Sequence, residues 1–497
     1  MTVRTRMHLA VRLPGADDTT VLTTGRRSAS PADFASFERL ARTAERGLFD
    51  FLLLDGGRSS PEHEGRVHDQ DVVGRPEAIT VLNALAAVTE RLGLAATADA
   101  IFEEPYELAR RLATLDHLSG GRAAWNVVTS SDASAAENLR RGGCPDAAGR
   151  YPLAAEFVQT SRELWDSWTP DGASRPFAHR GRYFDIEGEF TVPRPPQGHP
   201  VVIHAGDSSA GRELAARAAD VLLADWGSGD GFPDRRVSRH GALEAGRSLR
   251  AEMKGRLAAY GRSPGELKIM PVVAFVLGDT AAEARERAAD IHRRQFSARD
   301  AISALERIRG VDLSSYDPDG PLPDIAPDLG LDLDLDLDLD RVRDPNPDRE
   351  PDPSPDSDPG PSPSQDRAQD RAQGRALVRA QDRALDRARA TDVVTVAEKW
   401  WALAREKGLS VRQAAIEMSG RRPIVGTPEA IAAELDEGVR TGAADGFVLV
   451  PPATPGGLDE FADRVVPLLQ ERGAFRTEYT DTTLRSHLGL AEPVWKG

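Results

Sequence analysis

The chain has 497 residues and a formal net charge of -16, with 63 Lys and Arg against 79 Asp and Glu. This acidic surplus repels phosphate backbones and acidic lipid headgroups, so neither nucleic acid nor a membrane surface is an expected partner. Hydrophobic residues make up 40% of the sequence, enough for the core of one large domain or of two to three ordinary ones.

Cysteine content and apolar runs bear on the compartment and on metal binding. The single Cys144 has no partner for an intramolecular disulfide, and no Cys/His cluster has the spacing of a zinc site. The first residues lack the pattern of a secretory signal, and no apolar run reaches the roughly 18 to 20 residues that cross a bilayer. We therefore expect a cytoplasmic protein with no bound metal.

Short apolar or β-branched runs alternate with longer segments of helical periodicity. The runs predict strands at residues 7–11, 49–54, 94–97, 123–128, 201–204, 221–224, 268–276 and 446–450. Helical periodicity predicts helices at residues 31–45, 76–91, 105–118, 151–168, 209–219, 242–260, 280–296 and 458–472. About eight repeats of one strand-helix unit predict an α/β protein with a closed (β/α)8 TIM barrel.

A doubly wound open sheet would show the same alternation. That fold usually carries a G-x-G-x-x-G dinucleotide fingerprint in its first turn, and this sequence has none, so the barrel is favoured. In a barrel the chemistry lies on the loops that follow the carboxyl ends of the strands. Candidate functional residues are therefore sought at those ends.

Residues 328–390 break the pattern with an alternating Leu-Asp run, a Pro-rich acidic stretch and repeated Gln-Asp-Arg-Ala tetrads. Crowded carboxylates repel one another and prolines remove backbone donors, so we expect a low-complexity, disordered insert. Calcium binding is the alternative, but the run lacks the glycines and mixed carbonyl ligands of calcium loops. The insert separates an N-terminal barrel part, 1–327, from a barrel completion and C-terminal segment, 391–497.

Three polar residues end predicted strands. Asp55 precedes two glycines, so its carboxylate projects at the barrel mouth, where backbone can approach a ligand; a turn cap is the alternative. Thr97 and Asn126 offer a hydroxyl and an amide to a polar heterocycle. For Asn126 the alternative is a hydrogen bond to a neighbouring loop.

The segment HAGDSSAGRELAARAAD joins a predicted strand to a helix through small residues. Free N–H groups at such a helix start can bind a monophosphate, whereas Ser208 or Ser209 can also be an ordinary cap. Tyr151, which opens an earlier helix, can hydrogen-bond the same phosphate or can pack against the barrel rim.

Four longer segments carry a family resemblance: residues 125–138 (WNVVTSSDASAAEN), 150–168, 181–224 and 426–490. They resemble the NtaA/SnaA/DszA branch of the bacterial luciferase-like flavin monooxygenases, and the likeness covers essentially the whole chain outside 328–390. The resemblance implies a (β/α)8 barrel that receives reduced FMN from a separate NAD(P)H:flavin reductase. It further implies a two-component monooxygenase that uses O2 to oxygenate a small organic substrate.

Carried over residue by residue, the family's flavin contacts fall on Asp55, Thr97, Asn126, Tyr151 and Ser208. Two positions depart from the family's pattern. Ala147 stands where a His is frequent, four residues before the Tyr of the R-Y motif, and Asp207 replaces the first Ser of an AGSS-like turn. We also expect a homo-oligomer.

Two other functions stay open. A deazaflavin-dependent oxidoreductase would transfer hydride on the same barrel without oxygen, and a non-catalytic flavin-binding protein would keep the barrel without turnover. Because the cofactor carries the hard chemistry, a strong side-chain acid or base is not required, and no catalytic residue is assigned. His8 and His204 are candidates, with a structural role expected for each.

Overall fold

The computed structural model describes residues 6–13, 21–22, 33–55, 62–63, 66–67, 76–129, 147–206, 208–226, 239–295, 302, 316–317, 319–321, 402, 404–414, 423–451, 453–454 and 456–496. The chain divides into two compact units, one of Met1–Gln295 with Gly420–Gly497 and one of Phe296–Ser419. The predicted insert, 328–390, lies outside the described residues. Its disorder and the domain boundaries drawn around it stay predictions.

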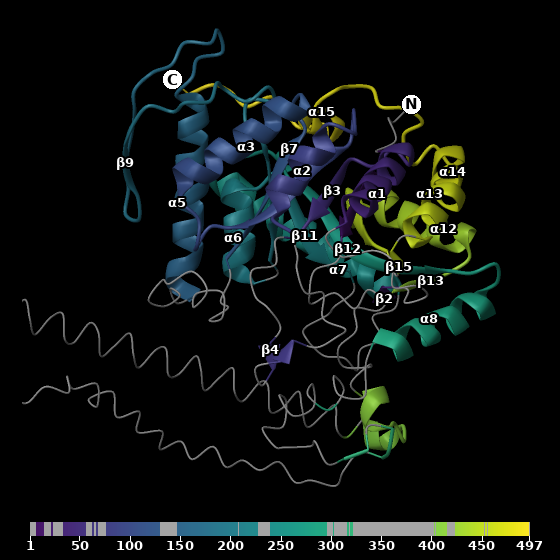
Figure 1. Ribbon diagram of the computed structural model, residues 1–497. Helices are drawn as coiled ribbons and strands as arrows, with labels where there is room; N and C mark the ends of the chain where they lie inside the picture. Colours follow the sequence, from purple (N-terminus) through teal and green to yellow (C-terminus); the bar gives the residue numbers. More distant parts are fainter. Residues whose placement is uncertain are drawn as a thin grey trace, which may run out of the picture. The chain divides into compact units, whose positions relative to one another are not determined.

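Eight parallel strands of the first unit, all within its described residues, close into a barrel (Figure 1). In order around the barrel they are β1 (His8–Leu13), β3 (Phe51–Leu54), β6 (Gly93–Asp99), β7 (Ala123–Val128), β10 (Val201–Ala205), β11 (Val221–Asp225), β12 (Lys268–Leu277) and β14 (Gly446–Val450). The ring closes because β14 pairs with β1 and β11 pairs with β12. The predicted (β/α)8 barrel is confirmed.

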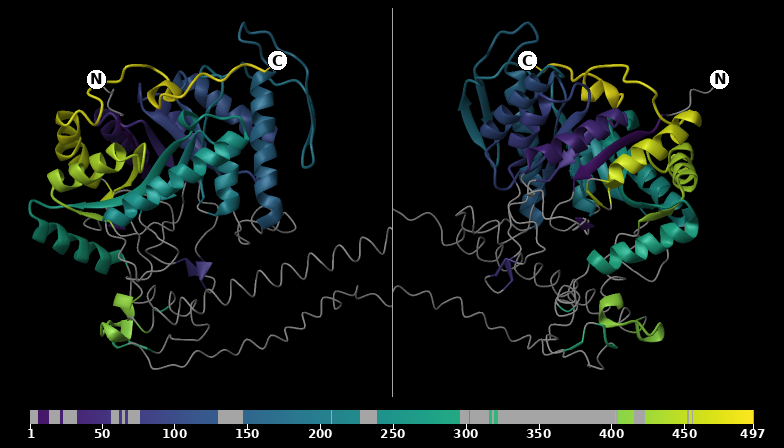
Figure 2. Two further views of the ribbon diagram at one scale, coloured as in Figure 1. Left: turned by 180° about the vertical axis from the view of Figure 1, so that it is seen from behind. Right: turned by 45° about the vertical axis from the view of Figure 1, so that its right-hand side comes forward.

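Helices follow the barrel strands and lie around their outer side (Figure 2). They are α1 (Phe34–Arg46), α2 (Ala78–Ala86), α3 (Pro105–Ser119), α5 (Ala147–Asp166), α6 (Ser209–Ala218), α7 (Arg239–Ala259), α8 (Ala281–Gln295), α12 (Pro428–Arg440), α13 (Gly456–Arg464) and α14 (Val466–Glu471). Neighbours pack on one another, as α2 does on α3, α3 on α5 and α5 on α6. This layer buries the outer face of the strands.

Side chains alternate along each strand between the barrel interior and the helix-facing outside. One buried cluster fills the interior and includes Ala10, Phe51, Leu53, Ala95, Ala124, Val201, Ile203, Met270 and Val448. The residues between them pack against the helices, among them Leu9, Val11, Leu52, Leu94, Trp125 and Val202. Because both faces are buried, the strands are nearly continuous apolar runs, which made them predictable.

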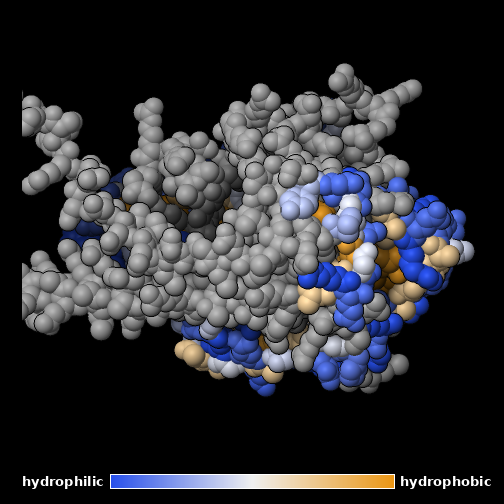
Figure 3. Space-filling model, turned by 90° about the horizontal axis from the view of Figure 1, so that it is seen from below, coloured by the Kyte–Doolittle hydropathy of each residue, from blue (hydrophilic) through white to orange (hydrophobic). Residues whose placement is uncertain are grey.

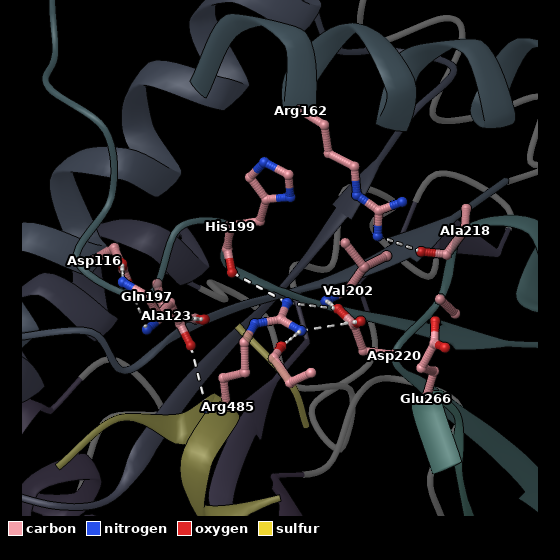
Figure 4. A network of polar contacts seen from close by, with 12 residues as sticks. Asp116, Ala123, Arg162, Gln197, His199, Val202, Ala218, Asp220, Glu266 and Arg485 are labelled. Carbon is pink, nitrogen blue, oxygen red and sulfur yellow. Dashed lines mark hydrogen bonds and ion pairs between the residues drawn. The ribbon is translucent and has the colours of Figure 1, made fainter. Parts of the chain in front are cut away.

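The C-terminal segment closes the barrel at the amino ends of its strands. Apolar side chains of α15 (Leu484–His487) and of the residues after it join the interior cluster, namely Leu484, Leu488 and Leu490. Arg485 donates from Nη2 to Oδ2 of Asp220 at 3.0 Å and to the carbonyl oxygen of His199 at 3.2 Å (Figure 4). His199 and Asp220 stand just before β10 and β11, so this contact lies at the end opposite the expected site.

A hairpin of β8 (Phe177–Arg180) and β9 (Asp185–Gly188) packs beside α5 and was not predicted. The carboxylate of Glu156 on α5 accepts hydrogen bonds from the backbone N–H groups of the hairpin turn, at Arg182, Tyr183 and Phe184. The remaining short elements are β2 (Val21–Leu22), β4 (Glu62–His63), β5 (Arg66–Val67), β13 (Ile424–Gly426), β15 (Ala453–Thr454) and a 3-10 turn at Pro264–Glu266.

The second unit is described in only a few stretches. Pro321 and Ser410 form an isolated antiparallel bridge, and the Val411 N–H donates to the carbonyl oxygen of Gly320 at 3.1 Å. Arg412 donates from Nη2 to Oδ2 of Asp319 at 3.0 Å. These contacts join chain segments from the two sides of the predicted insert.

The described surface is mixed in character. On the face that Figure 3 shows, hydrophilic residues cover most of the described area, and the strongly apolar residues in view lie between them. No helix within the described ranges is long and apolar enough to cross a membrane.

Candidate functional site

Four polar side chains occupy the carboxyl ends of four adjacent barrel strands. Arg12 lies on β1, Asp55 directly follows β3, Thr97 lies on β6 and Asn126 on β7. Each stands two positions after a member of the interior cluster, so all four share the inward face of the barrel. We call these four residues the mouth row.

Hydrogen bonds connect the mouth row from strand to strand. Arg12 Nε donates to Asp55 Oδ2 at 2.8 Å, and Thr97 Oγ1 donates to Asp55 Oδ1 at 2.9 Å. Asn126 Nδ2 then donates to Thr97 Oγ1 at 3.1 Å. The structure thus brings Asp55, Thr97 and Asn126 together, as the barrel geometry predicted.

Sequence reasoning missed Arg12 as a member of this site. The available signal was its position, a single cation that directly follows the first predicted strand, 7–11, two residues beyond Ala10. An isolated charge on the buried face of a strand needs a partner, because an unpaired buried charge is costly. The partner is Asp55 on the neighbouring strand, at 2.8 Å.

One hydrogen-bond acceptor of the mouth row has no partner among the described residues. Asn126 is 4% exposed, and its Oδ1 atom is buried without a hydrogen-bond partner among the described residues. A buried unsatisfied carbonyl costs about 1–3 kcal/mol, so native proteins leave few of them. A ligand that donates a hydrogen bond would remove this cost.

A second polar group lies at the start of α6. Ser208 is the N-cap of α6, and its Oγ accepts a hydrogen bond from the Gly211 N–H at 3.0 Å. The hydroxyl of Tyr151, from α5, lies 3.1 Å from the same Oγ. Ser208 therefore does cap the helix, and Tyr151 is positioned beside it at the positive end of the helix dipole. Asp207 lies outside the described residues.

His204 is buried beneath this helix start, with 2% of its surface exposed. Its Nδ1 lies 2.9 Å from the carbonyl oxygen of Val127, so Nδ1 carries the hydrogen and Nε2 is the acceptor of a neutral ring. Burial lowers the pKa of His204 below its usual range, which favours that neutral form. Nε2 is buried without a partner in the described part of the chain.

The turn beside His204 requires glycine. A Cβ atom added to Gly206 would lie 2.8 Å from His204 Nε2 and 3.3 Å from the Cα of Gly211. The Tyr151 ring stands edge-on to the His204 ring, with centroids 6.5 Å apart. His204 thus lies under a turn whose backbone comes close to the helix start, and its structural role stays a prediction.

His8, the other histidine candidate, lies at the opposite end of the barrel. Its Nδ1 is 3.2 Å from Oδ1 of Asp50, and Arg476 pairs with the same carboxylate. Although burial alone would raise it, the charges of Arg476 and His8 lower the pKa of Asp50 to about 2. This cluster ties the C-terminal segment to β1 and β3, so His8 has a structural role.

The five predicted contact residues therefore fall into two places. Asp55, Thr97 and Asn126 belong to the mouth row, and Tyr151 lies beside Ser208 at the start of α6. The first place can accept a hydrogen bond from a heterocycle, and the second can donate to an anion. No group of three or more His, Cys, Asp or Glu in the described ranges could hold a metal ion.

Comparisons with known proteins give one consistent result. Residues 7–317 match the luciferase-like monooxygenase family. The chain is 33% identical to nitrilotriacetate monooxygenase component A of Aminobacter aminovorans, over 93% of this chain and 91% of that protein. It is 34% identical to dibenzothiophene-sulfone monooxygenase of Rhodococcus erythropolis strain XP, over 100% of this chain and 99% of that protein. The solved EDTA monooxygenase from Chelativorans sp. BNC1 is 28% identical, with a TM-score of 0.66 over 98% of this chain and 99% of that one.

Proposed function

The chain belongs to the luciferase-like monooxygenase family, and we propose that it uses reduced FMN and O2 to oxygenate a small organic substrate. As a family member it is a flavin-dependent monooxygenase, an oxidoreductase. The proposal adds the mononucleotide form of the flavin and its delivery in the reduced state by a separate NAD(P)H:flavin reductase. It also assigns Asp55, Thr97, Asn126, Tyr151 and Ser208 to the cofactor site.

The observation that carries the proposal is the unpartnered, buried Oδ1 of Asn126 at the barrel mouth. An isoalloxazine ring has N–H groups that can donate to such an acceptor. A single phosphate suits the other place, since the first N–H groups of a helix have no partner within the helix and the Tyr151 and Ser208 hydroxyls lie beside the start of α6. The residues present therefore fit a flavin mononucleotide.

The chain's own residues would bind the flavin, orient it and exclude water from it. When bound, the flavin supplies two electrons, so that one atom of O2 enters the substrate and the other leaves as water. Asn126, held in place through Thr97 and Asp55, would bind the ring, and Ser208 and Tyr151 would bind the phosphate. Beneath the mouth row lies the apolar interior cluster, which would exclude water from the inner side of the site.

A partner component and a location complete the proposal. The relative from Aminobacter aminovorans is named as component A, which supports a second component that reduces the flavin. The absence of a G-x-G-x-x-G fingerprint in the sequence agrees with reduction elsewhere. We place the reaction in the cytoplasm, in keeping with a single cysteine, and in a homo-oligomer.

The test supplies NADH, FMN and an unrelated flavin reductase under ¹⁸O2, with a substrate panel of aminopolycarboxylates, aryl sulfones and alkyl sulfides. We expect a product that gains one ¹⁸O atom, and none when the reductase is omitted. If every electron were recovered as hydrogen peroxide across the panel, the chain would be a flavin-binding protein without turnover. Anaerobic conversion with a reduced deazaflavin would favour the hydride-transfer alternative instead.

A further inference from the structure

We propose that Arg12 and Asp55 are positioning residues that act through Thr97 to turn the carbonyl oxygen of the Asn126 side chain toward the ligand. The inference rests on the proposed flavin site and deepens it, because it states which chemical group the ring must present there. That group is an N–H donor. The direction of each hydrogen bond along the mouth row determines which atom of Asn126 faces the ligand.

Asp55 sets the direction of the hydrogen bonds along the mouth row. Its carboxylate is ion-paired with Arg12 through Oδ2, at 2.8 Å, and a carboxylate can only accept hydrogen bonds. The Thr97 hydroxyl, 2.9 Å from Oδ1, must therefore donate its single hydrogen to Asp55. Toward its other neighbour, the same hydroxyl can only accept.

The consequence reaches Asn126, two strands away from Asp55. Its side chain lies 3.1 Å from Thr97 Oγ1, and only the amide nitrogen can donate there. The carbonyl oxygen Oδ1 must then point away from Thr97, and it is the atom that is buried without a partner among the described residues. The row of bonds thus fixes the orientation of the amide and leaves its carbonyl oxygen as the acceptor that a ligand can use.

A ligand group facing Oδ1 must donate, because two acceptors in contact repel and leave both unsatisfied. The oxidised isoalloxazine ring has one N–H, at N3, and the reduced ring has additional N–H groups. Either source fits the same acceptor. The two are distinguished by experiment.

The first experiment measures the dissociation constant of oxidised FMN by fluorescence titration. Thr97→Val removes the hydroxyl and frees the amide to rotate, so we expect binding about ten-fold weaker, the scale of one hydrogen bond. Thr97→Ser keeps the hydroxyl and should bind as the wild type does. Thr441→Val, which removes a threonine hydroxyl at the end of α12, is the matched control and should leave binding unchanged.

A double-mutant cycle separates positioning from direct contact. If Thr97 acts through Asn126, the Thr97→Val/Asn126→Leu double variant binds FMN no more weakly than Asn126→Leu alone. Arg12→Met combined with Asn126→Leu should behave in the same way. Additive losses would overturn the proposal, since they would mean that Thr97 or Arg12 contacts the flavin independently.

The ligand arm uses N3-methyl-FMN and the reduced flavin. If the wild type binds N3-methyl-FMN more weakly than FMN, and Asn126→Leu binds the two equally, the donor is N3–H. If the wild type binds reduced FMN more tightly than oxidised FMN, and Asn126→Leu does not, the donor is an N–H of the reduced ring. If the wild type shows neither of these two preferences, the assignment of an N–H donor is overturned. If the wild type bound no flavin at all, the proposed function itself would fail, whereas equal binding by wild type and Thr97→Val would refute only the positioning role.

Discussion

Arg485 and Asp220 form a buried ion pair, in which Nη2 of the arginine lies 3.0 Å from Oδ2 of the aspartate (Figure 4). Asp220 also accepts the Val202 N–H at 2.9 Å, at the start of β10. Burial opposes the charge of Asp220, but the positive charges of Arg485 and Arg162 outweigh it and lower the pKa of this carboxyl. The pair therefore fastens the C-terminal segment to the amino ends of β10 and β11.

Replacing Arg485 by Ala should destabilise the protein strongly. The change leaves the Asp220 carboxylate buried without its direct partner, which costs about 3–5 kcal/mol. Chemical denaturation measures the free energy of unfolding. Arg180→Ala is the matched control, because the Arg180 side chain is 78% exposed and its loss should change stability by about 0.5 kcal/mol or less. Equal effects of the two changes would contradict the structural role of the pair.

Ser208→Ala should weaken flavin binding as well as the helix. The Ser208 side chain caps α6, and that of Thr427 caps α12 in the same manner. Each Ala variant should lose about 0.5–2 kcal/mol of stability. Only Ser208→Ala should also lose about 1–2 kcal/mol of FMN affinity, the scale of one hydrogen bond to a charged group. Unchanged flavin affinity in Ser208→Ala, measured by titration, would remove Ser208 from the cofactor site.

His204 should make stability fall on acidification. Burial lowers its pKa in the folded state, so below about pH 6.5 the unfolded chain takes up a proton that the folded chain does not. The contribution is absent at neutral pH and grows as the pH falls toward 5. His204→Gln should reduce the loss of stability between pH 7 and pH 5, whereas His240→Gln, at a side chain that is 76% exposed, should not.

Stability must be compared between wild type and variant because Asp116 changes the pH dependence of stability in the opposite direction to His204. Burial raises the pKa of Asp116 to about 6, so as the pH falls through that value the folded state binds a proton that the unfolded state does not. Acidification therefore stabilises the fold at Asp116 and destabilises it at His204. An unchanged pH dependence in His204→Gln would show that this histidine does not titrate differently in the two states.

Removing residues 328–390 and closing the gap with a short flexible linker should leave the fold stable. The expectation comes from composition, since this stretch has too few apolar residues to bury a core. Thermal unfolding of the deletion variant should shift by a few degrees at most. A drop of many degrees would mean that the stretch packs as a structural element.

Much of the architecture was determined by the sequence alone. The eight barrel strands are buried on both faces, so each one is a short apolar run with no polar alternation to obscure it. Their regular alternation with helices left few topologies to consider. The same periodicity placed Asp55, Thr97 and Asn126 at strand ends, where a barrel carries its chemistry. The hairpin of β8 and β9 was missed because it depends on hydrogen bonds to Glu156 rather than on an apolar pattern.

Only the tertiary structure decided which of these residues touch one another. The period of two along a strand assigns a side chain to the inner or the outer face of the barrel. Strand order and register then determine which side chain of the adjacent strand lies next to it. Closure of the barrel set Arg12 beside Asp55 and directed the hydrogen bonds from there to Asn126. It likewise brought Arg485 under β11, because partners hundreds of positions apart in the chain meet only when the ring of strands is complete.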